Sequence, residues 1–180
     1  MDKRVEANRD TRLRIIKAVV RLLERKNLSD ISVTDIVEEA GVARASYYRN
    51  YDSKEEVLSE AGRMIIDDFR RNREGVEEAC CDYEEVARTF RYFLQYREPM
   101  LALHRAGFTS IYEGLFADYV QERMGVAGSD AASSYRASFF AGALFSVYVK
   151  WLERGMDESP EQMARTFCSM AAGVFEERSS

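Results

Sequence analysis

Residues 31–58 constrain the fold more than any other part of the chain, because they carry two helix signals separated by a glycine. Ser32 and Asp35 have the spacing of a capping box, in which each residue satisfies an unpaired backbone donor of the other. Apolar residues follow at helical spacing. Gly41 comes where a tight turn needs a residue that tolerates positive φ. The pattern predicts a helix over residues 33–40, a turn, and a second short helix over residues 42–51.

A third helix signal follows directly. Ser53 and Glu56 repeat the capping-box spacing and open a longer helix. Two short helices joined by a glycine turn are the geometry that lays the second helix in the major groove of DNA. An ordinary helical hairpin with a solvated outer face has the same local pattern, so these signals alone leave both interpretations open.

The segment resembles the signature of the TetR family of bacterial regulators, T-V-x-D-I-A-x-x-A-G-V-S-x-G-T-F-Y-x-H-F-x-S-K-E-E-L. The match has no gap and consists of Ser32-Val33, Asp35-Ile36, Ala40-Gly41-Val42, Arg44, Ser46-Tyr47-Tyr48-Arg49, Tyr51 and Ser53-Lys54-Glu55-Glu56. The sequence departs mildly from the signature, with Val37 for Ala, Ala45 for Gly and Asn50 for His, and the aromatic position of Tyr51 holds tyrosine in place of Phe. The resemblance implies an all-α fold with an N-terminal three-helix DNA-binding domain and a C-terminal helical domain for ligand binding and dimerisation.

The resemblance also implies which side chains meet DNA. Groove-facing positions of the recognition helix hold Arg44, Ala45 and Arg49; an arginine there can bond guanine, and an alanine methyl can touch the thymine methyl. Thr34 matches a position that reaches DNA in relatives. Phosphate contacts, which set register without reading sequence, are implied for Ser46, Tyr48 and Lys54. Asn50 stands where the family's histidine touches a phosphate, and Tyr47 and Tyr51 match buried aromatic positions.

The charge distribution agrees with a DNA-binding N-terminus, although the chain as a whole is acidic. Residues 1–51 carry 11 Lys and Arg against 8 Asp and Glu, a net charge of +3. Residues 52–180 carry 15 against 23, a net charge of −8. Affinity for duplex DNA comes largely from local neutralisation of phosphates, so a modestly basic end on an acidic body is sufficient.

Helical signals continue along the chain, without strand alternation or internal repeats, and we expect about nine helices. Further predicted starts are a capping box at Asp82 and Glu85, a cap at Ser129 or Asp130, and a capping box at Ser159 and Gln162. Predicted helix ranges outside the motif are 9–26, 53–73, 82–94, 99–107, 109–124, 130–154 and 159–177. We predict a DNA-binding domain over residues 1–52 and an effector-binding and dimerisation domain over residues 53–180, with helix 53–73 as connector.

Aromatic residues are concentrated in the predicted C-terminal domain, where residues 90–151 hold 14 of the 21. Such a set either fills the core of a helical bundle or lines an apolar cavity. The resemblance favours a cavity, since regulators of this family commonly bind a small effector there. We expect Phe93, Phe116, Phe140 and Tyr148 to form the wall for a mostly apolar ligand and His104 or Tyr112 to orient it.

A homodimer is expected, because one recognition helix reads only a few base pairs and two-fold pairing across a palindromic operator is the usual solution. Helices eight and nine (130–154 and 159–177) present small and apolar residues for this contact, among them Met163, Phe167 and Met170. The alternative is that these faces pack within one subunit. The segment WLERGMDESPEQM is also similar to a C-terminal domain type found among TetR relatives of dihydroxyacetone-kinase regulators, a likeness that fixes no ligand.

Other function classes have little support. The chain has one histidine and no nucleophile elbow, glycine-rich phosphate loop or metal-ligand cluster, so we expect neither an enzyme nor a cofactor or metal. Redox sensing through Cys80 or Cys81 stays an alternative to inert thiols. The sequence lacks a signal peptide and any apolar run of membrane-spanning length, so a cytoplasmic address is expected. We predict a sequence-specific DNA-binding regulator that acts as a repressor and is relieved by a small-molecule effector. The alternative is a helical interaction module or co-regulator that has lost specific DNA binding.

Overall fold

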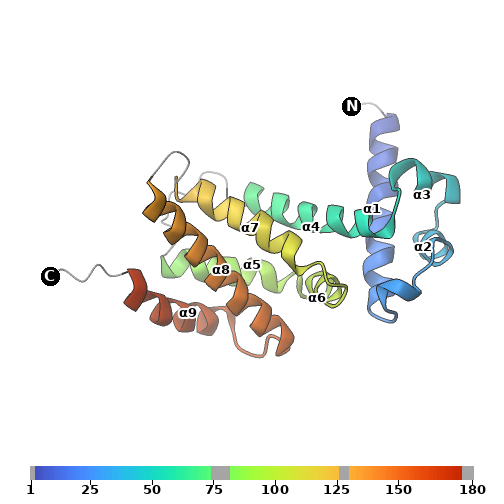
Figure 1. Ribbon diagram of the computed structural model, residues 1–180. Coiled ribbons are helices and arrows are strands. Elements are labelled where there is room, and N and C mark those ends of the chain that lie inside the picture. Colours follow the sequence, from blue (N-terminus) through green and yellow to red (C-terminus); the bar gives the residue numbers. More distant parts are fainter. Residues whose placement is uncertain (1–2, 74–81, 126–129, 176–180) are drawn as a thin grey trace. The chain divides into compact units, whose positions relative to one another are not determined.

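The computed structural model describes residues 3–73, 82–125 and 130–175, which form nine α-helices and one short 3-10 helix and contain no strand (Figure 1). The helices are α1 (Lys3–Leu23), α2 (Val33–Ala40), α3 (Arg44–Asn50), α4 (Lys54–Arg71), α5 (Tyr83–Leu94), α6 (Arg97–Arg105), α7 (Thr109–Arg123), α8 (Ala131–Glu153) and α9 (Pro160–Phe175), with the 3-10 helix η1 (Leu28–Asp30) between α1 and α2. The predicted all-α fold is confirmed.

The chain forms two compact units. The units are Met1–Ile65 with Glu98–Ile111 (unit 1) and Ile66–Arg97 with Tyr112–Ser180 (unit 2). The connector helix α4 contributes residues to both units. The functional division into residues 1–52 and 53–180 stays a prediction.

Unit 1 has an apolar core between α1, α2, α3 and the first half of α4. Side chains from all four helices are buried, namely Ile15, Val19, Ile36, Tyr47, Tyr51, Val57 and Leu58. The first helix begins and ends earlier than the predicted range of 9–26, because α1 extends from Lys3 to Leu23. Its first described side chains are exposed, so the apolar periodicity that located the helix in the sequence begins only after the helix has started.

The predicted capping box at the start of α2 is confirmed. Ser32 Oγ accepts a hydrogen bond from the Asp35 N–H at 3.1 Å, and Asp35 Oδ2 accepts one from the Ser32 N–H at 2.8 Å. The Lys26 ammonium lies 2.7 Å from Asp35 Oδ1. This hydrogen bond is the largest of the interactions that lower the pKa of the Asp35 carboxyl.

Other helix starts also follow local sequence signals. At α9, Ser159 and Gln162 exchange side-chain and backbone hydrogen bonds, as a capping box requires. Asp130 caps α8 by accepting from a backbone N–H of the first turn at 2.8 Å. Ser53 accepts from the Glu56 N–H at 3.1 Å, but the Glu56 carboxylate accepts from the backbone one residue before Ser53.

The predicted capping box at α5 is wrong. Asp82 is the N-cap residue, but its side chain makes no capping hydrogen bond. Glu85 is 4% exposed and pairs with Arg73, whose Nη2 lies 2.8 Å from Glu85 Oε1. Arg73 also donates to the Glu85 carbonyl and to the Thr89 hydroxyl. A buried guanidinium depends on these partners, whereas water can satisfy an exposed helix end.

Unit 2 is a bundle of α5, α7, α8 and α9 with the last turns of α4 (Figure 1). The ion pair between Arg91 Nε and Glu161 Oε1, 2.9 Å apart, joins α5 to α9. The Phe90 ring meets the Trp151 ring edge to face, with centroids 5.4 Å apart. Gly155, at a φ of 85°, follows α8, where a left-handed residue ends the helix.

The buried pair between Arg73 and Glu85 generates a stability prediction. We expect Glu85→Ala to lower the free energy of unfolding by about 3–5 kcal/mol, because it leaves a guanidinium buried without its counter-charge. Urea unfolding followed by circular dichroism measures the change. Arg73→Met combined with Glu85→Leu should recover much of the loss, since packed apolar side chains can replace a buried ion pair.

The control is Arg154→Ala, which removes an exposed arginine 3.9 Å from Glu158. Its effect on the free energy of unfolding should stay within about 0.5 kcal/mol, as for most surface substitutions. Equal effects of Glu85→Ala and Arg154→Ala would contradict the importance of the buried pair.

Candidate DNA-binding site

The turn between α2 and α3 has the backbone that the sequence predicted. Gly41 is left-handed, with φ 62° and ψ 41°, and its N–H donates to the Glu38 carbonyl at 3.2 Å. Arg14 from α1 closes over the turn, where Nη2 donates to the Gly41 carbonyl at 2.6 Å. Sequence analysis missed this role of Arg14, because a contact across 27 positions has no local signal.

Three of the predicted DNA-contact residues lie together on an exposed face of α2 and α3. Arg44 Nη1 donates to Thr34 Oγ1 at 3.1 Å, and Arg44 Nη2 donates to the Tyr48 hydroxyl at 3.2 Å. The guanidinium carbon also lies 5.6 Å from the centroid of the Tyr48 ring, within cation–π range. All three side chains are exposed.

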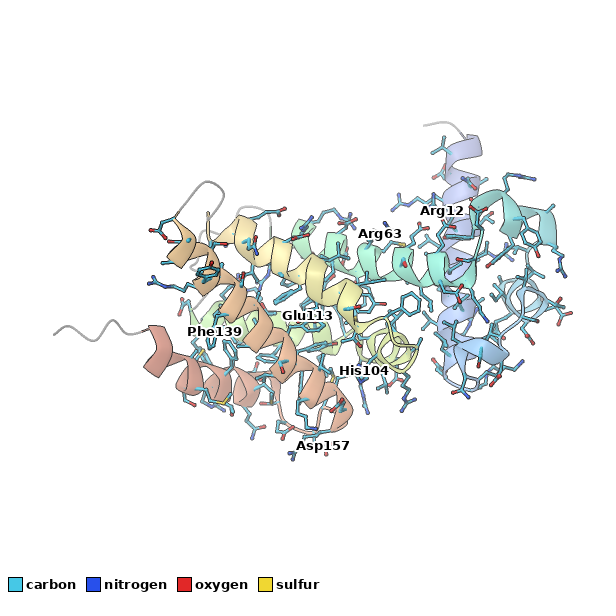
Figure 2. The ribbon with its side chains drawn as sticks, in the orientation of Figure 1. Arg12, Arg63, His104, Glu113, Phe139 and Asp157 are labelled. Carbon is cyan, nitrogen blue, oxygen red and sulfur yellow. The ribbon has the colours of Figure 1, made fainter. Side chains whose placement is uncertain are left out.

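The two remaining tyrosines of the motif are core residues, as predicted. Tyr47 and Tyr51 are 0% and 2% exposed, with ring centroids 6.1 Å apart. Burial raises the pKa of Tyr47 to about 12. Arg12 of α1 stacks 5.7 Å from the Tyr51 ring and pairs with Glu60 of α4 at 2.6 Å, a link that the sequence did not reveal (Figure 2 labels Arg12).

A second face of α3 borders a cleft of about 430 Å³ beside the N-terminal half of α1. The lining comprises Val5, Ala7, Asn8, Thr11, Ser46, Arg49 and Asn50. Arg49 is the only charged residue of this lining, and it is exposed. The Asn50 amide donates to the Ser46 carbonyl at 2.8 Å. A cleft with one guanidinium and no carboxylate suits an anion, such as a phosphate.

Lys54 and Ala45 complete the set of predicted contacts. Ala45 is exposed on α3. The Lys54 ammonium donates to the carbonyl oxygens of Leu28 and Ile31, the second at 3.0 Å, and so ties η1 to the start of α4. Sequence analysis missed this structural role, and the phosphate contact assigned to Lys54 stays a prediction.

Five of the six predicted effector residues are buried. Their exposed fractions are 1% for Tyr112, 2% for Phe140, 4% for Phe116 and 5% for both Phe93 and Tyr148. The Phe93 ring contacts those of Tyr148 and Phe116, with centroids 5.3 and 6.0 Å away, so unit 2 brings these three together. Phe140 pairs with Phe167 of α9 at 5.4 Å.

Two of these residues carry unpaired polar groups. The hydroxyls of Tyr112 and Tyr148 are buried and have no hydrogen-bond partner among the described residues. Burial raises the pKa of both phenols. His104, the sixth predicted effector residue, belongs to unit 1, where its Nδ1 lies 2.8 Å from Thr109 Oγ1.

The two helices predicted to form the dimer, α8 and α9, each have a buried face and an exposed face. Met163 and Phe167 of α9 are buried within the chain at 9% and 3% exposure. Large apolar side chains that α8 and α9 leave exposed are Tyr135, Phe139 and Met170 (Phe139 is labelled in Figure 2).

The remaining sequence predictions concern metals, thiols and membranes. Cys80 and Cys81 lie outside the described residues, and Cys168 is half-buried. Within the described ranges, no group of three or more His, Cys, Asp or Glu could hold a metal ion. In the same part of the chain, every helix is too short or too polar to cross a membrane.

Family models match both ends of the described fold. The family described as bacterial regulatory proteins, tetR family, matches residues 15–61. A second model, described as a transcriptional regulator C-terminal region, matches residues 86–173. No curated protein matches the chain.

Solved structures share the fold at low sequence identity. A TetR transcriptional regulator from Streptococcus agalactiae 2603V is 20% identical, with a TM-score of 0.68, over 93% of this chain and 96% of that one. NalD, the secondary repressor of the MexAB-OprM multidrug efflux pump in Pseudomonas aeruginosa, is 15% identical with a TM-score of 0.68 over 93% and 96%. The dihydroxyacetone kinase operon activator DhaS is 18% identical with a TM-score of 0.62 over 92% and 96%.

The helix-turn-helix and the helical region behind it therefore match, in the same order, the two family models and the folds of known regulators, and the chain belongs to the TetR family of transcriptional regulators.

Proposed function

We propose that the chain binds a palindromic DNA operator as a homodimer and represses transcription until a small, mostly apolar effector releases it. The observation that carries the DNA-binding part is the exposed Arg44, held beside Thr34 and Tyr48 on the outer face of the helix-turn-helix. An arginine at this place can bond bidentately to guanine in the major groove.

Some of the other predicted residues contact DNA bases in this proposal, and the rest contact the DNA backbone. Ala45 is exposed next to Arg44 and supplies a methyl group for a thymine contact. The lining of the cleft beside α1 supports phosphate contacts by Ser46 and Asn50. Arg49, for which the resemblance implies a groove-facing position, shares this lining and brings a positive charge without a neighbouring carboxylate, so we assign it a phosphate contact instead. Lys54 completes the proposed backbone contacts.

The buried tyrosine hydroxyls support the effector site. A buried hydroxyl without a hydrogen bond costs about 1–3 kcal/mol, so a ligand oxygen or nitrogen that pairs with it gains affinity. Tyr148 offers this group beside Phe93, which in turn contacts Phe116. Tyr112 offers a second one. We assign the effector an apolar body with one or two hydrogen-bonding atoms, and Phe140 keeps its proposed place at the site.

Repression is the simpler mode for such a protein, since a dimer that occupies promoter DNA blocks transcription without further contacts. Relatives of the same fold include both an activator and a repressor by name. The alternative is a helical interaction module or co-regulator that has lost specific DNA binding. A gel shift on DNA flanking its own gene separates the two, because the module would retard this DNA no better than an unrelated duplex.

Arg49 provides a test of the backbone contacts. We expect Arg49→Gln to weaken binding to specific and unrelated duplexes by similar factors and to reduce the slope of log K against log salt by about 0.9. The probes are the duplex that the wild-type chain selects from a random pool and a scrambled version of it. Fluorescence anisotropy in increasing KCl measures both quantities.

Arg63→Gln is the matched control, since Arg63 is another exposed arginine but lies on α4, outside the helix-turn-helix (Figure 2). It should leave affinity and salt slope unchanged. A loss for Arg49→Gln confined to the selected duplex would instead make Arg49 a base contact.

The exposed apolar side chains of α8 and α9 provide a test of the dimer. Phe139 is 51% exposed, and Tyr135 precedes it by one helical turn at 74%. We expect Phe139→Asp to convert the dimer to a monomer of 20.7 kDa in light scattering at micromolar concentration, because burying the new carboxylate is costly. Leu94→Asp, at a 36% exposed position on α5, should leave the dimer intact. A wild-type monomer would refute the proposed assembly.

The tyrosine hydroxyls make a prediction that needs no ligand. We expect Tyr148→Phe to leave the ligand-free chain equally stable or up to about 1 kcal/mol more stable in urea unfolding, because it removes a buried group without a partner. Tyr112→Phe should behave in the same way. A loss above about 1 kcal/mol would mean that the hydroxyl is already satisfied, which removes its support for the effector site.

A further inference from the structure

The hydrogen bonds of Arg44 leave part of its guanidinium unused. A guanidinium has five N–H donors in a rigid plane. Nη1 directs one to Thr34 and Nη2 directs one to Tyr48, at 3.1 and 3.2 Å. Within the described part of the chain, Nε–H and one N–H on each of Nη1 and Nη2 therefore stay available, and a bidentate contact with guanine needs two donors.

Both acceptors lie beside contacts that are internal to the motif. Thr34 lies in the first turn of α2, inside the capping box that Ser32 and Asp35 form. The Tyr48 ring packs edge to face on the buried ring of Tyr47, with centroids 5.4 Å apart. Arg44 is thus held from α2 on one side and from α3 on the other.

An arginine held in this way is pre-organised. A free arginine side chain carries about 2 kcal/mol of rotamer entropy, which is lost when it is ordered on a base. Contacts that order it before binding reduce this cost. They also fix the plane of the guanidinium, and hence which base edge it can meet with two parallel hydrogen bonds.

We propose that Thr34 and Tyr48 are positioning residues for Arg44, whose guanidinium they orient toward one base pair of the operator. The resemblance assigns them to direct DNA contact; here their effect passes through Arg44. This inference rests on the proposed function, in which Arg44 reads a base.

The test compares Thr34→Val and Tyr48→Phe, which remove the acceptor hydroxyls and keep the bulk of each side chain. The probes are the duplex selected by the wild-type chain and a set in which each base pair is replaced in turn. We expect each variant to lose about three- to tenfold of the discrimination at one shared base pair, the one at which Arg44→Ala also loses it. Affinity for a scrambled duplex and the salt slope should not change.

A double-mutant cycle separates positioning from direct contact, because residues that act through one another are not additive. In the Arg44→Ala background, Thr34→Val and Tyr48→Phe should have no further effect. Full additivity would overturn the proposal, because it would show that Thr34 and Tyr48 act independently of Arg44. An equal loss of affinity for every duplex would also overturn it and would indicate direct contacts with the DNA backbone. Ser59→Ala removes a hydroxyl of unit 1 that bonds to the backbone of its own helix, and it should behave as wild type.

The cycle also distinguishes the failure of this inference from the failure of the proposed function. If Arg44→Ala kept full discrimination at every base pair, Arg44 would not read DNA and the proposed docking would be wrong. If Arg44→Ala lost discrimination while Thr34→Val and Tyr48→Phe kept it, the docking would stand and only the positioning would be refuted.

Discussion

The left-handed turn at Gly41 sets the relation between α2 and α3 on which the proposed DNA-binding face depends. Arg44 can bond to Thr34 only because this turn brings the first residue of α3 back beside the first turn of α2. Arg14 ties the turn to α1 through the Gly41 carbonyl. Another residue at position 41 would occupy a backbone region that costs about 1–2 kcal/mol, and its Cβ would lie 2.8 Å from Arg14 Nη2. A substitution at Gly41 would therefore strain the turn and displace the Arg14 guanidinium from the Gly41 carbonyl.

A capping signal that is complete within four residues predicts where a helix starts, but not whether both partners of the box bond to each other. Ser32 with Asp35 and Ser159 with Gln162 form their capping boxes because both partners lie in the same turn. Glu85 has the same local signal but pairs with Arg73, which no local pattern could reveal. Burial decides between the two outcomes: the carboxylate at α5 lies inside unit 2, where a counter-charge stabilises it more than a helix end would.

The candidate site was predictable in its members but not in their connections. Family positions and helical spacing placed Thr34, Arg44 and Tyr48 in the motif, and all three are exposed. The Arg44 guanidinium joins the other two side chains, and this contact depends on side-chain directions that the folded turn sets. The same holds for Lys54, for which the resemblance implies a phosphate contact, while its ammonium donates to the carbonyl oxygens of Leu28 and Ile31. In unit 2, the aromatic pattern gave the buried set but not its grouping, in which Phe93 joins Tyr148 to Phe116.

The connector helix α4 is held by polar contacts in each unit to which it contributes. In unit 1, Glu60 pairs with Arg12 of α1 at 2.6 Å. In unit 2, Asp68 accepts from the hydroxyls of Tyr92 and Tyr96 at 2.6 and 2.9 Å, and these bonds lower the pKa of its carboxyl. In the proposed mechanism, an effector that moves α5 therefore acts on α4 through Asp68. Because the pKa of the Asp68 carboxyl is lowered in the folded protein, the carboxylate accepts these two hydrogen bonds at neutral pH. Their contribution is lost as the pH falls through this lowered pKa. Linkage then requires operator DNA to weaken effector binding by the same factor by which effector weakens DNA binding.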